Sequence, residues 1–395
     1  MPRITPETIA DDSAFIARLT EIRQDIHRHP ETAFEEVRTS DIVAAFLQAL
    51  GMEVHRGLGG TGVVGTLKGR KPGQKVIGLR ADMDALFIAE TTGKPYASQV
   101  PGKMHACGHD GHTTMLLGAA EKLAQDPDFA GTVQFIFQPA EEGLGGARVM
   151  IEDGLFDLFP CDEVYGVHND PKQPLGQVKT RPGPFMSAGD TWEVIFEGTG
   201  GHGAMPHNAT DPTIPAAQFI ASLATIISRK VPANDGAIVS VGHIAAGDYN
   251  SPNIIPAKVT VRGTARSYRP EVRDTLEQMI GALARGAATP YDIIATLIYT
   301  RRYPPLINTA REVDLAVRAA SATVGAHRVQ PEAERVGGSE DFSFMLEKVP
   351  GAYVMIGNGD GPDAAFVHTP KFDFNDALIP IGVAYWMNVV AESLG

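Results

Sequence analysis

The sequence predicts an α/β protein in which a mixed β-sheet flanked by helices is interrupted by a smaller α+β domain of the split βαβ type. Strand and helix patterns alternate over residues 1–185, a compact β-α-β-β-α-β order follows, and the first pattern then resumes. We therefore expect one discontinuous domain, residues 1–185 and 299–395, with a second domain inserted at residues 186–298. A chain of 395 residues has room for both.

Two amphipathic helices open the chain, because apolar residues recur at helical spacing in residues 11–28 and 41–50. Buried strands are expected at residues 63–67, 76–79 and 132–138, with a helix at 116–123 before the last of them. Functional groups in such folds gather on loops at the carboxyl ends of strands. Asp82, Asp84 and Glu141 each lie just beyond an apolar strand.

The inserted segment predicts strands and helices of its own. Strands are expected at residues 192–197, 237–243 and 258–266, and helices at residues 215–228 and 271–285. After about residue 300, a helix at 313–324, a strand at 353–356 and a helix at 376–393 resume the first pattern.

Charge and cysteine content restrict the partners and the compartment. The net charge of −13 is spread along the chain without a basic run, so neither nucleic acid nor an anionic membrane is an expected partner. Cys107 and Cys161 are the only cysteines, which predicts no disulfide framework and a reducing, cytoplasmic compartment. The N-terminus lacks an apolar signal core, and no apolar run reaches the roughly 20 residues of a membrane span.

Residues 104–112, Met-His-Ala-Cys-Gly-His-Asp-Gly-His, hold three imidazoles, a thiol and a carboxylate. Imidazole and thiolate are the usual ligands of zinc and related metals. Cys107 and His109 lie two residues apart, so an extended chain would aim both at one point. The segment therefore predicts at least two metal ligands.

Further donors are expected from distant strand ends. Glu141 and Glu142 follow one apolar strand, His168 follows another at 164–167, and His368 lies in Phe366-Val-His-Thr-Pro370. Adjacent side chains of an extended chain point to opposite sides, which suits one glutamate to metal binding and the other to general-base catalysis. A solvated acidic turn is the alternative.

Asp82 and Asp84 share one face of the strand that ends there, and one of them could hold a ligand histidine through its free N–H. Alternatively, the two aspartates cap the following turn or pair with Arg80.

The inserted domain contributes a glycine-rich segment, residues 198–207, around His202. An imidazole projecting from such a segment could stabilise a developing oxyanion. Asn253 and Arg266 add an amide and a guanidinium, and the guanidinium suits bidentate recognition of a substrate carboxylate. Arg266 could equally be a surface strand residue.

Together these segments resemble the hippurate hydrolase and indole-acetyl-amino-acid hydrolase branch of the aminoacylase and carboxypeptidase metallopeptidase family. The resemblance extends from about residue 20 to the C-terminus. The matching motifs are Arg80–Leu86, His105–His112, Gln138–Gly143, Gly200–His207, Gly338–Phe342 and His368–Pro370.

The resemblance implies a two-metal peptidase-type catalytic domain and a ferredoxin-like lid and dimerisation domain, hence a homodimer or higher homo-oligomer. It implies a supporting carboxylate at Asp84, and a lid histidine, His202, that reaches a neighbouring subunit's active site. It also assigns the general base to Glu141. The implied metal ligands are Cys107, His109, Glu142, His168 and His368. The wider family has a histidine ligand where this chain has Asp82, so the metal arrangement of other branches does not transfer, and whether Cys107 bridges both ions stays open.

The implied reaction is hydrolysis of the amide bond of N-acyl amino acids, such as hippurate or N-acetyl conjugates. Two divalent ions, zinc or manganese with cobalt or nickel as alternatives, would lower the pKa of a bound water to about 7, and Glu141 would accept its proton. A dipeptidase or carboxypeptidase of the same family and a catalytically silent metal-binding homologue are the alternatives. A thiol-redox role for Cys107 is disfavoured because the chain has no Cys-x-x-Cys pattern.

Overall fold

The computed structural model describes residues 4–359 and 364–395 and divides the chain into two units. Unit 1 comprises Met1–Gly183, Ile307–Glu334 and Asp341–Gly395, and unit 2 comprises Pro184–Leu306 and Arg335–Glu340. The domain boundary expected between residues 298 and 299 falls inside strand β13 (Ile294–Tyr303), which completes the sheet of unit 2. Sequence patterns alone also gave no sign of the short segment Arg335–Glu340, which returns to unit 2.

Unit 1 is built on an eight-stranded mixed sheet with the order β1-β2-β4-β3-β5-β16-β6-β15. Its central strands β4, β3, β5 and β16 run parallel to one another, whereas β2 pairs antiparallel with both β1 and β4. The strands are β1 (Glu53–Leu58), β2 (Gly62–Lys68), β3 (Lys71–Asp82), β4 (Ala130–Gln138), β5 (Glu163–Pro174), β6 (Val178–Lys179), β15 (Val329–Gln330) and β16 (Gly351–Gly359). Two further short strands, β7 (Gly183–Met186) and β14 (Leu306–Asn308), pair with each other.

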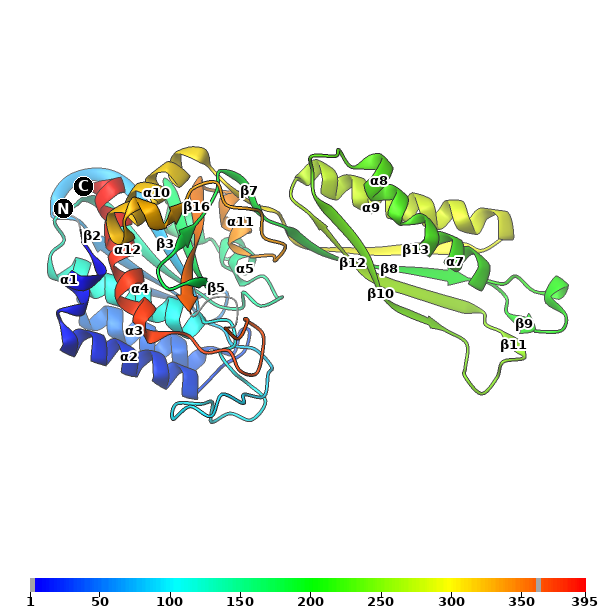
Figure 1. The fold of residues 1–395 in the computed structure, drawn as a ribbon, viewed down its shortest axis with the longest axis horizontal. Helices are drawn as coiled ribbons and strands as arrows, with labels where there is room; N and C mark the ends of the chain where they lie inside the picture. Colours follow the sequence, from blue (N-terminus) through cyan, green and yellow to red (C-terminus); the bar gives the residue numbers. More distant parts are fainter. Residues whose placement is uncertain (1–3, 360–363) are drawn as a thin grey trace. The chain divides into compact units, whose positions relative to one another are not determined.

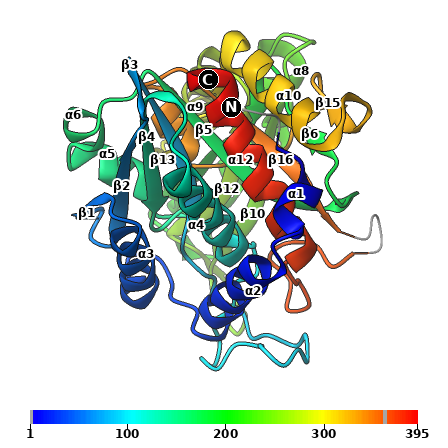
Figure 2. The same cartoon turned by 90° about the vertical axis from the view of Figure 1, so that its left-hand side faces the viewer.

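Helices α3, α4, α10 and α12 pack on this sheet and on one another (Figures 1 and 2). Helix α4 is buried over most of its length, which is why its sequence lacks the one-sided apolar pattern of a surface helix. The helices of unit 1 are α1 (Pro6–Ala10), α2 (Ser13–Arg28), α3 (Val37–Ala49), α4 (His109–Gln125), α5 (Gly146–Glu152), α6 (Leu155–Leu158), α10 (Ala310–Val324), α11 (Phe342–Leu346) and α12 (Ile379–Leu394), with short 3-10 turns η3 (Ala326–Arg328) and η4 (Asp376–Leu378).

One segment of the described residues, Asp376–Leu394, has the length and apolar composition of a membrane span. However, 67% of it is buried inside the structure, and α12 packs against α4 and α10. We interpret it as a core helix, because a helix that is apolar all round belongs in the interior of a large domain as readily as in a membrane.

Unit 2 has an antiparallel four-stranded sheet with the order β10-β12-β8-β13. Helices α7 (Thr213–Ser222), α8 (Ala224–Lys230) and α9 (Pro270–Ala288) cover one face of it (Figure 1). The strands are β8 (Ala188–Glu197), β10 (Ala237–Ala246), β12 (Lys258–Ser267) and β13. In chain order this is the split βαβ arrangement that the sequence predicted. A separate ribbon pairs β9 (Gly201–His202) with β11 (Ile254–Ile255), and the 3-10 turns η1 (Pro206–Asn208) and η2 (Thr289–Tyr291) complete the unit.

Candidate metal centre

Cys107 and His109 reach the site through a glycine turn rather than the extended chain expected from the sequence. Gly108 has φ +99 and precedes His109, the first residue of α4. A Cβ atom at Gly108 would lie 2.4 Å from Nδ2 of Asn169, so only glycine fits both the conformation and the space. The turn presents the Cys107 thiol and the His109 ring at the start of one buried helix.

The five expected metal ligands come together in unit 1. Donor atoms of Cys107, His109 and His168 lie within 4.8 Å of one another, and so do those of Cys107, Glu142 and His368. Cys107 therefore belongs to two groups of three donors. A third group, His109, Glu141 and Glu142, places the expected general base beside the ligands.

Asp84 holds His109 and the glutamate turn at the same time. Nδ1–H of His109 donates to Oδ1 of Asp84 at 3.1 Å, and the backbone N–H of Glu142 donates to Oδ2 of Asp84 at 2.9 Å. Nε2 of His109 is buried and has no hydrogen-bond partner. A metal-bound histidine typically has this arrangement: a carboxylate fixes one ring nitrogen, and the other nitrogen has no hydrogen-bond partner in the protein.

The two other histidines aim their Nε2 atoms at the Cys107 sulfur, each at 3.3 Å. Nδ1–H of His168 donates to the carbonyl oxygen of Asn169 at 2.6 Å, so the lone pair of the neutral ring is on Nε2. Nε2 of His368 lies 3.0 Å from Oε1 of Glu142. The His368 side chain is 50% exposed, so this side of the cluster is open to small molecules.

His112, though part of the same motif, has both ring nitrogens occupied. Nδ1–H donates to Oδ1 of Asp82 at 2.6 Å, and Nε2 accepts from the backbone N–H of Asn169 at 3.0 Å. Asp82 also accepts from Arg80 at 2.6 Å. We therefore interpret Asp82 and His112 as buried residues that support the site through their hydrogen bonds. The sequence did not assign this role to His112.

The charge distribution of the donor set fits divalent cations. Burial and the carboxylates of Glu142 and Glu141 raise the pKa of the Cys107 thiol well above its ordinary value. Burial alone would lower the pKa of His109, but Asp82 and Asp84 outweigh it and raise that pKa to about 10. Burial and the neighbouring His112 hold the pKa of His168 well below its ordinary value. A cation in place of the protons would favour thiolate and neutral imidazole, the forms that bind metal.

Glu141 and Glu142 lie on a turn, not on the extended strand end that the sequence suggested. Ala140, just before them, has φ +53, and N–H of Gly143 donates to the carbonyl oxygen of Glu141 at 2.8 Å. Both carboxylates therefore approach His109 instead of pointing to opposite sides.

The remaining three candidates belong to unit 2. His202 lies on β9 opposite Ile254 of β11, and N–H of Gly203 donates to the carbonyl oxygen of Asn253 at 2.7 Å, so His202 and Asn253 share one exposed ribbon. Arg266 lies on β12, half-buried, and donates to Oγ of Ser339.

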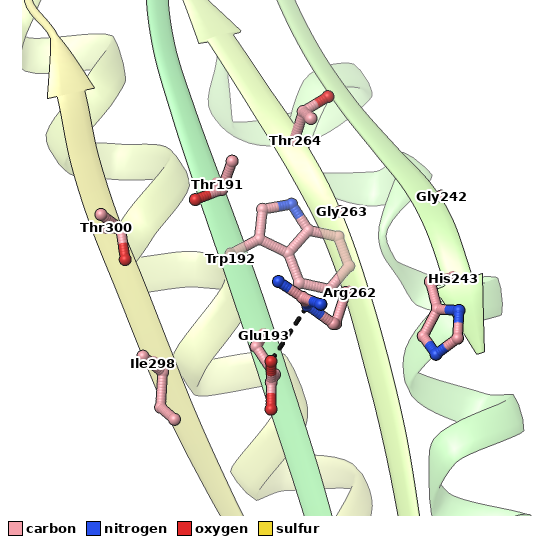
Figure 3. Close-up of a pocket in the computed structure, with 10 residues that line it drawn as sticks. All are labelled: Thr191, Trp192, Glu193, Gly242, His243, Arg262, Gly263, Thr264, Ile298 and Thr300. Atoms are coloured by element: carbon pink, nitrogen blue, oxygen red, sulfur yellow. Dashed lines mark ion pairs between the residues drawn. The ribbon is translucent and has the colours of Figure 1, made fainter. Parts of the chain in front are cut away.

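Unit 2 also has an open pocket of about 330 Å³ on its sheet (Figure 3). Arg262 and Glu193 form an ion pair across it at 3.0 Å, with His243 at one side (Figure 3). Because the two charges in the middle neutralise each other, we do not assign this pocket to catalysis.

Comparison with known proteins agrees with this geometry. Residues 78–392 match the model of peptidase family M20/M25/M40. The chain is 39% identical to hippurate hydrolase of Campylobacter jejuni, with 94% of this chain and 96% of the relative aligned, and 37% identical to N-acetylcysteine deacetylase of Bacillus subtilis, with 95% and 96% aligned. The solved structure of a dinuclear metal-binding peptidase of the M20 family from Bacillus subtilis matches with a TM-score of 0.83 and 33% identity, covering 96% of this chain and 98% of that one. The resemblance inferred from the motifs is confirmed, and the chain belongs to peptidase family M20/M25/M40.

Proposed function

We propose that this protein hydrolyses the amide bond of N-acyl amino acids and holds two divalent ions with Cys107, His109, Glu142, His168 and His368. The observation that carries the proposal is the convergence of these donors, which come from distant parts of the sequence, around a histidine fixed by Asp84. The relatives named for hydrolysis of hippurate and deacetylation of N-acetylcysteine support an N-acyl amino acid as the substrate class.

The ions would act as Lewis acids and lower the pKa of water at the site to about 7. We propose zinc or manganese, because the Cys107 thiolate favours zinc, whereas imidazole and carboxylate ligands also accept manganese, cobalt or nickel. Since Cys107 belongs to two donor groups, its thiolate would be within reach of either ion.

Glu141 is the proposed general base. Its carboxylate lies beside His109 and Glu142, where it can take the proton of the attacking water and return it to the leaving amine nitrogen. The products are a carboxylic acid and a free amino acid.

His202 is the proposed oxyanion donor, and its tautomer suits that role. The backbone N–H of Ala204 donates to Nδ1 of His202 at 3.1 Å, so Nε2 carries the hydrogen and can donate to the developing oxyanion. Asn253, on the same ribbon, is proposed to contact substrate. Arg266 has five N–H donors, and we propose that it binds the α-carboxylate of the amino-acid part.

A homodimer or higher homo-oligomer through unit 2 is proposed as well, together with a cytoplasmic location. Strand β10 is an edge of the unit 2 sheet, and its Ile238 and Ile244 are 51% and 56% exposed. Exposed apolar side chains on an unpaired edge are typical of a protein–protein contact. Light scattering coupled to gel filtration would measure the oligomeric state.

The function is tested by release of free amine from a substrate panel with the zinc-, manganese- and cobalt-loaded protein. The panel holds hippurate, N-acetyl amino acids, indole-acetyl conjugates and dipeptides. The proposal expects N-acyl amino acids to have the higher kcat/KM. A preference for dipeptides would instead support the dipeptidase alternative, and no turnover of any member would support a silent homologue.

A further inference from the structure

Glu36, at the start of α3, is a buried carboxylate that the proposed mechanism does not use. Its side chain has 0% exposure and accepts three hydrogen bonds. Oε1 accepts from the backbone N–H groups of Phe34 and Ala140, both at 3.0 Å, and Oε2 accepts from the hydroxyl of Thr61 at 2.7 Å. Glu36 therefore links α3 to the turn that carries Glu141 and Glu142.

Both residues whose N–H groups meet Oε1 of Glu36 have left-handed backbone conformations. Phe34 has φ +64 and Ala140 has φ +53, and among the described residues only two other non-glycine residues, Asp292 and His368, have positive φ. Such a conformation is unfavourable for a residue with a Cβ atom and persists only when its surroundings hold it. The carboxylate of Glu36 accepts the N–H of Ala140 and so holds this residue in its left-handed conformation.

The turn after Ala140 has two further anchors. Asp84 accepts the N–H of Glu142 at 2.9 Å, and Asp341 accepts the N–H of Ala147 at 2.9 Å. Asp84 and Asp341 hold the turn at Glu142 and Ala147. Glu36 holds it at its first residue, Ala140. Without Glu36, Ala140 can relax towards an ordinary conformation, which would rotate Glu141 and Glu142 away from His109.

We propose that Glu36 is a positioning residue for the Glu141–Glu142 pair: by holding the N–H of Ala140 it keeps this residue left-handed and both carboxylates at the metal centre. This inference rests on the proposed roles of Glu141 and Glu142. Burial and the nearby Asp84 raise the pKa of Glu36 to about 7, so a neutral glutamine is a conservative replacement for its side chain.

The test compares Glu36→Ala with Glu36→Gln and with a matched control, Glu31→Ala. Glu31 lies five residues earlier and also accepts three hydrogen bonds, from the N–H of Arg38 and from the N–H and hydroxyl of Thr39, but these cap α3. At saturating metal, we expect Glu36→Ala to lower kcat about a hundredfold, as a displaced catalytic group does. Glu36→Gln keeps an accepting oxygen and should stay within about threefold of the parent, and Glu31→Ala should lower the Tm with kcat unchanged.

Ala140→Gly supplies the decisive second readout, because glycine adopts positive φ without support. In the Glu36→Ala background, Ala140→Gly should raise kcat at least about tenfold. In the parent protein, the same substitution should not raise kcat. If Glu36→Ala does not fold, the same prediction applies to Glu36→Leu with and without Ala140→Gly. The proposal is overturned by an unchanged kcat in Glu36→Ala, by equal kcat losses in Glu36→Ala and Glu31→Ala, or by no recovery with Ala140→Gly. A parent protein inactive on every amide would contradict the proposed function itself, not this inference alone.

Discussion

His109 donates its Nδ1–H to Asp84 at 3.1 Å, and the second oxygen of Asp84 receives the backbone N–H of Glu142. One buried carboxylate thus orients two of the proposed metal ligands, one through its ring and the other through its backbone. The same contact raises the electron density on Nε2 of His109, which strengthens it as a ligand.

Replacing Asp84 should therefore weaken metal binding without removing a ligand. We expect Asp84→Ala to raise the Kd of the more weakly bound ion about 10- to 100-fold, the usual effect of losing a group that supports a ligand histidine. Competition with a chelator of known affinity measures this Kd. A Kd equal to that of the parent would show that Asp84 does not support the site.

Substitutions of Glu141 and Glu142 should have different effects on catalysis and on metal binding. Glu141→Ala should keep the bound metal and lower kcat about a thousandfold, because a general base contributes on this order. Glu142→Ala and His168→Ala should lose metal as well as activity. Metal content by mass spectrometry and kcat on the same samples give both quantities, and a fully active Glu141→Ala would reject its assignment as the base.

Cys107 should set the preference between metals. Thiolate is a soft ligand that favours zinc, so Cys107→Ser should raise the Kd for zinc by about tenfold or more, and the Kd for manganese by less. Isothermal titration of the metal-free protein with each ion measures the two affinities. Equal losses for both ions would mean that the sulfur does not select the metal.

A buried ion pair behind the site predicts a pH-dependent stability. Nδ1 of His27 lies 2.8 Å from Oδ2 of Asp110, and both side chains have 0% exposure. Burial alone would lower the pKa of His27, but Asp110 outweighs it and raises that pKa to about 9, and His27 in turn helps to lower the pKa of Asp110 against the effect of burial.

The contribution of His27 to the free energy of unfolding is present in full below its unfolded pKa of about 6.5. It is lost as the pH rises through about 9. The contribution of Asp110 is complete above its unfolded pKa of about 3.9 and is lost at lower pH. The parent should lose about 3 kcal/mol of unfolding free energy between pH 6 and pH 10 through His27. His27→Gln should be less stable at pH 6 and should lack this slope in urea unfolding. A parallel pH dependence of the two proteins would contradict the prediction.

The sequence predicts most of the fold and the donor cluster of residues 104–112 because both depend on local patterns. Buried strands and helices have apolar runs of the right length, and the donors are residue types with few other reasons to cluster. Motif order along the chain, together with the family resemblance, also leads to Glu142, His168 and His368, which are far from Cys107 in sequence but meet it in the structure.

Other features could not be predicted because they depend on contacts across the chain. Position 108 requires glycine because its φ is +99 and Asn169 leaves no space for a Cβ atom there, and this contact with Asn169 cannot be read from the local sequence. Glu36 binds Thr61 and Ala140, which lie 25 and 104 residues away, so its local sequence carries no sign of its role. The expected boundary at residue 298 divides β13, because the β-α-β-β-α-β pattern predicts a last strand in unit 2 but does not locate its end, which lies at Tyr303.

The central claim, that donors of unit 1 hold two catalytic ions, is tested most directly by titrating the metal-stripped protein with manganese or zinc while following hydrolysis of an N-acyl amino acid. We expect no turnover without metal and a rate that rises until two equivalents per chain are bound. Turnover that persists in the stripped protein, or that is indifferent to added metal, would contradict this account.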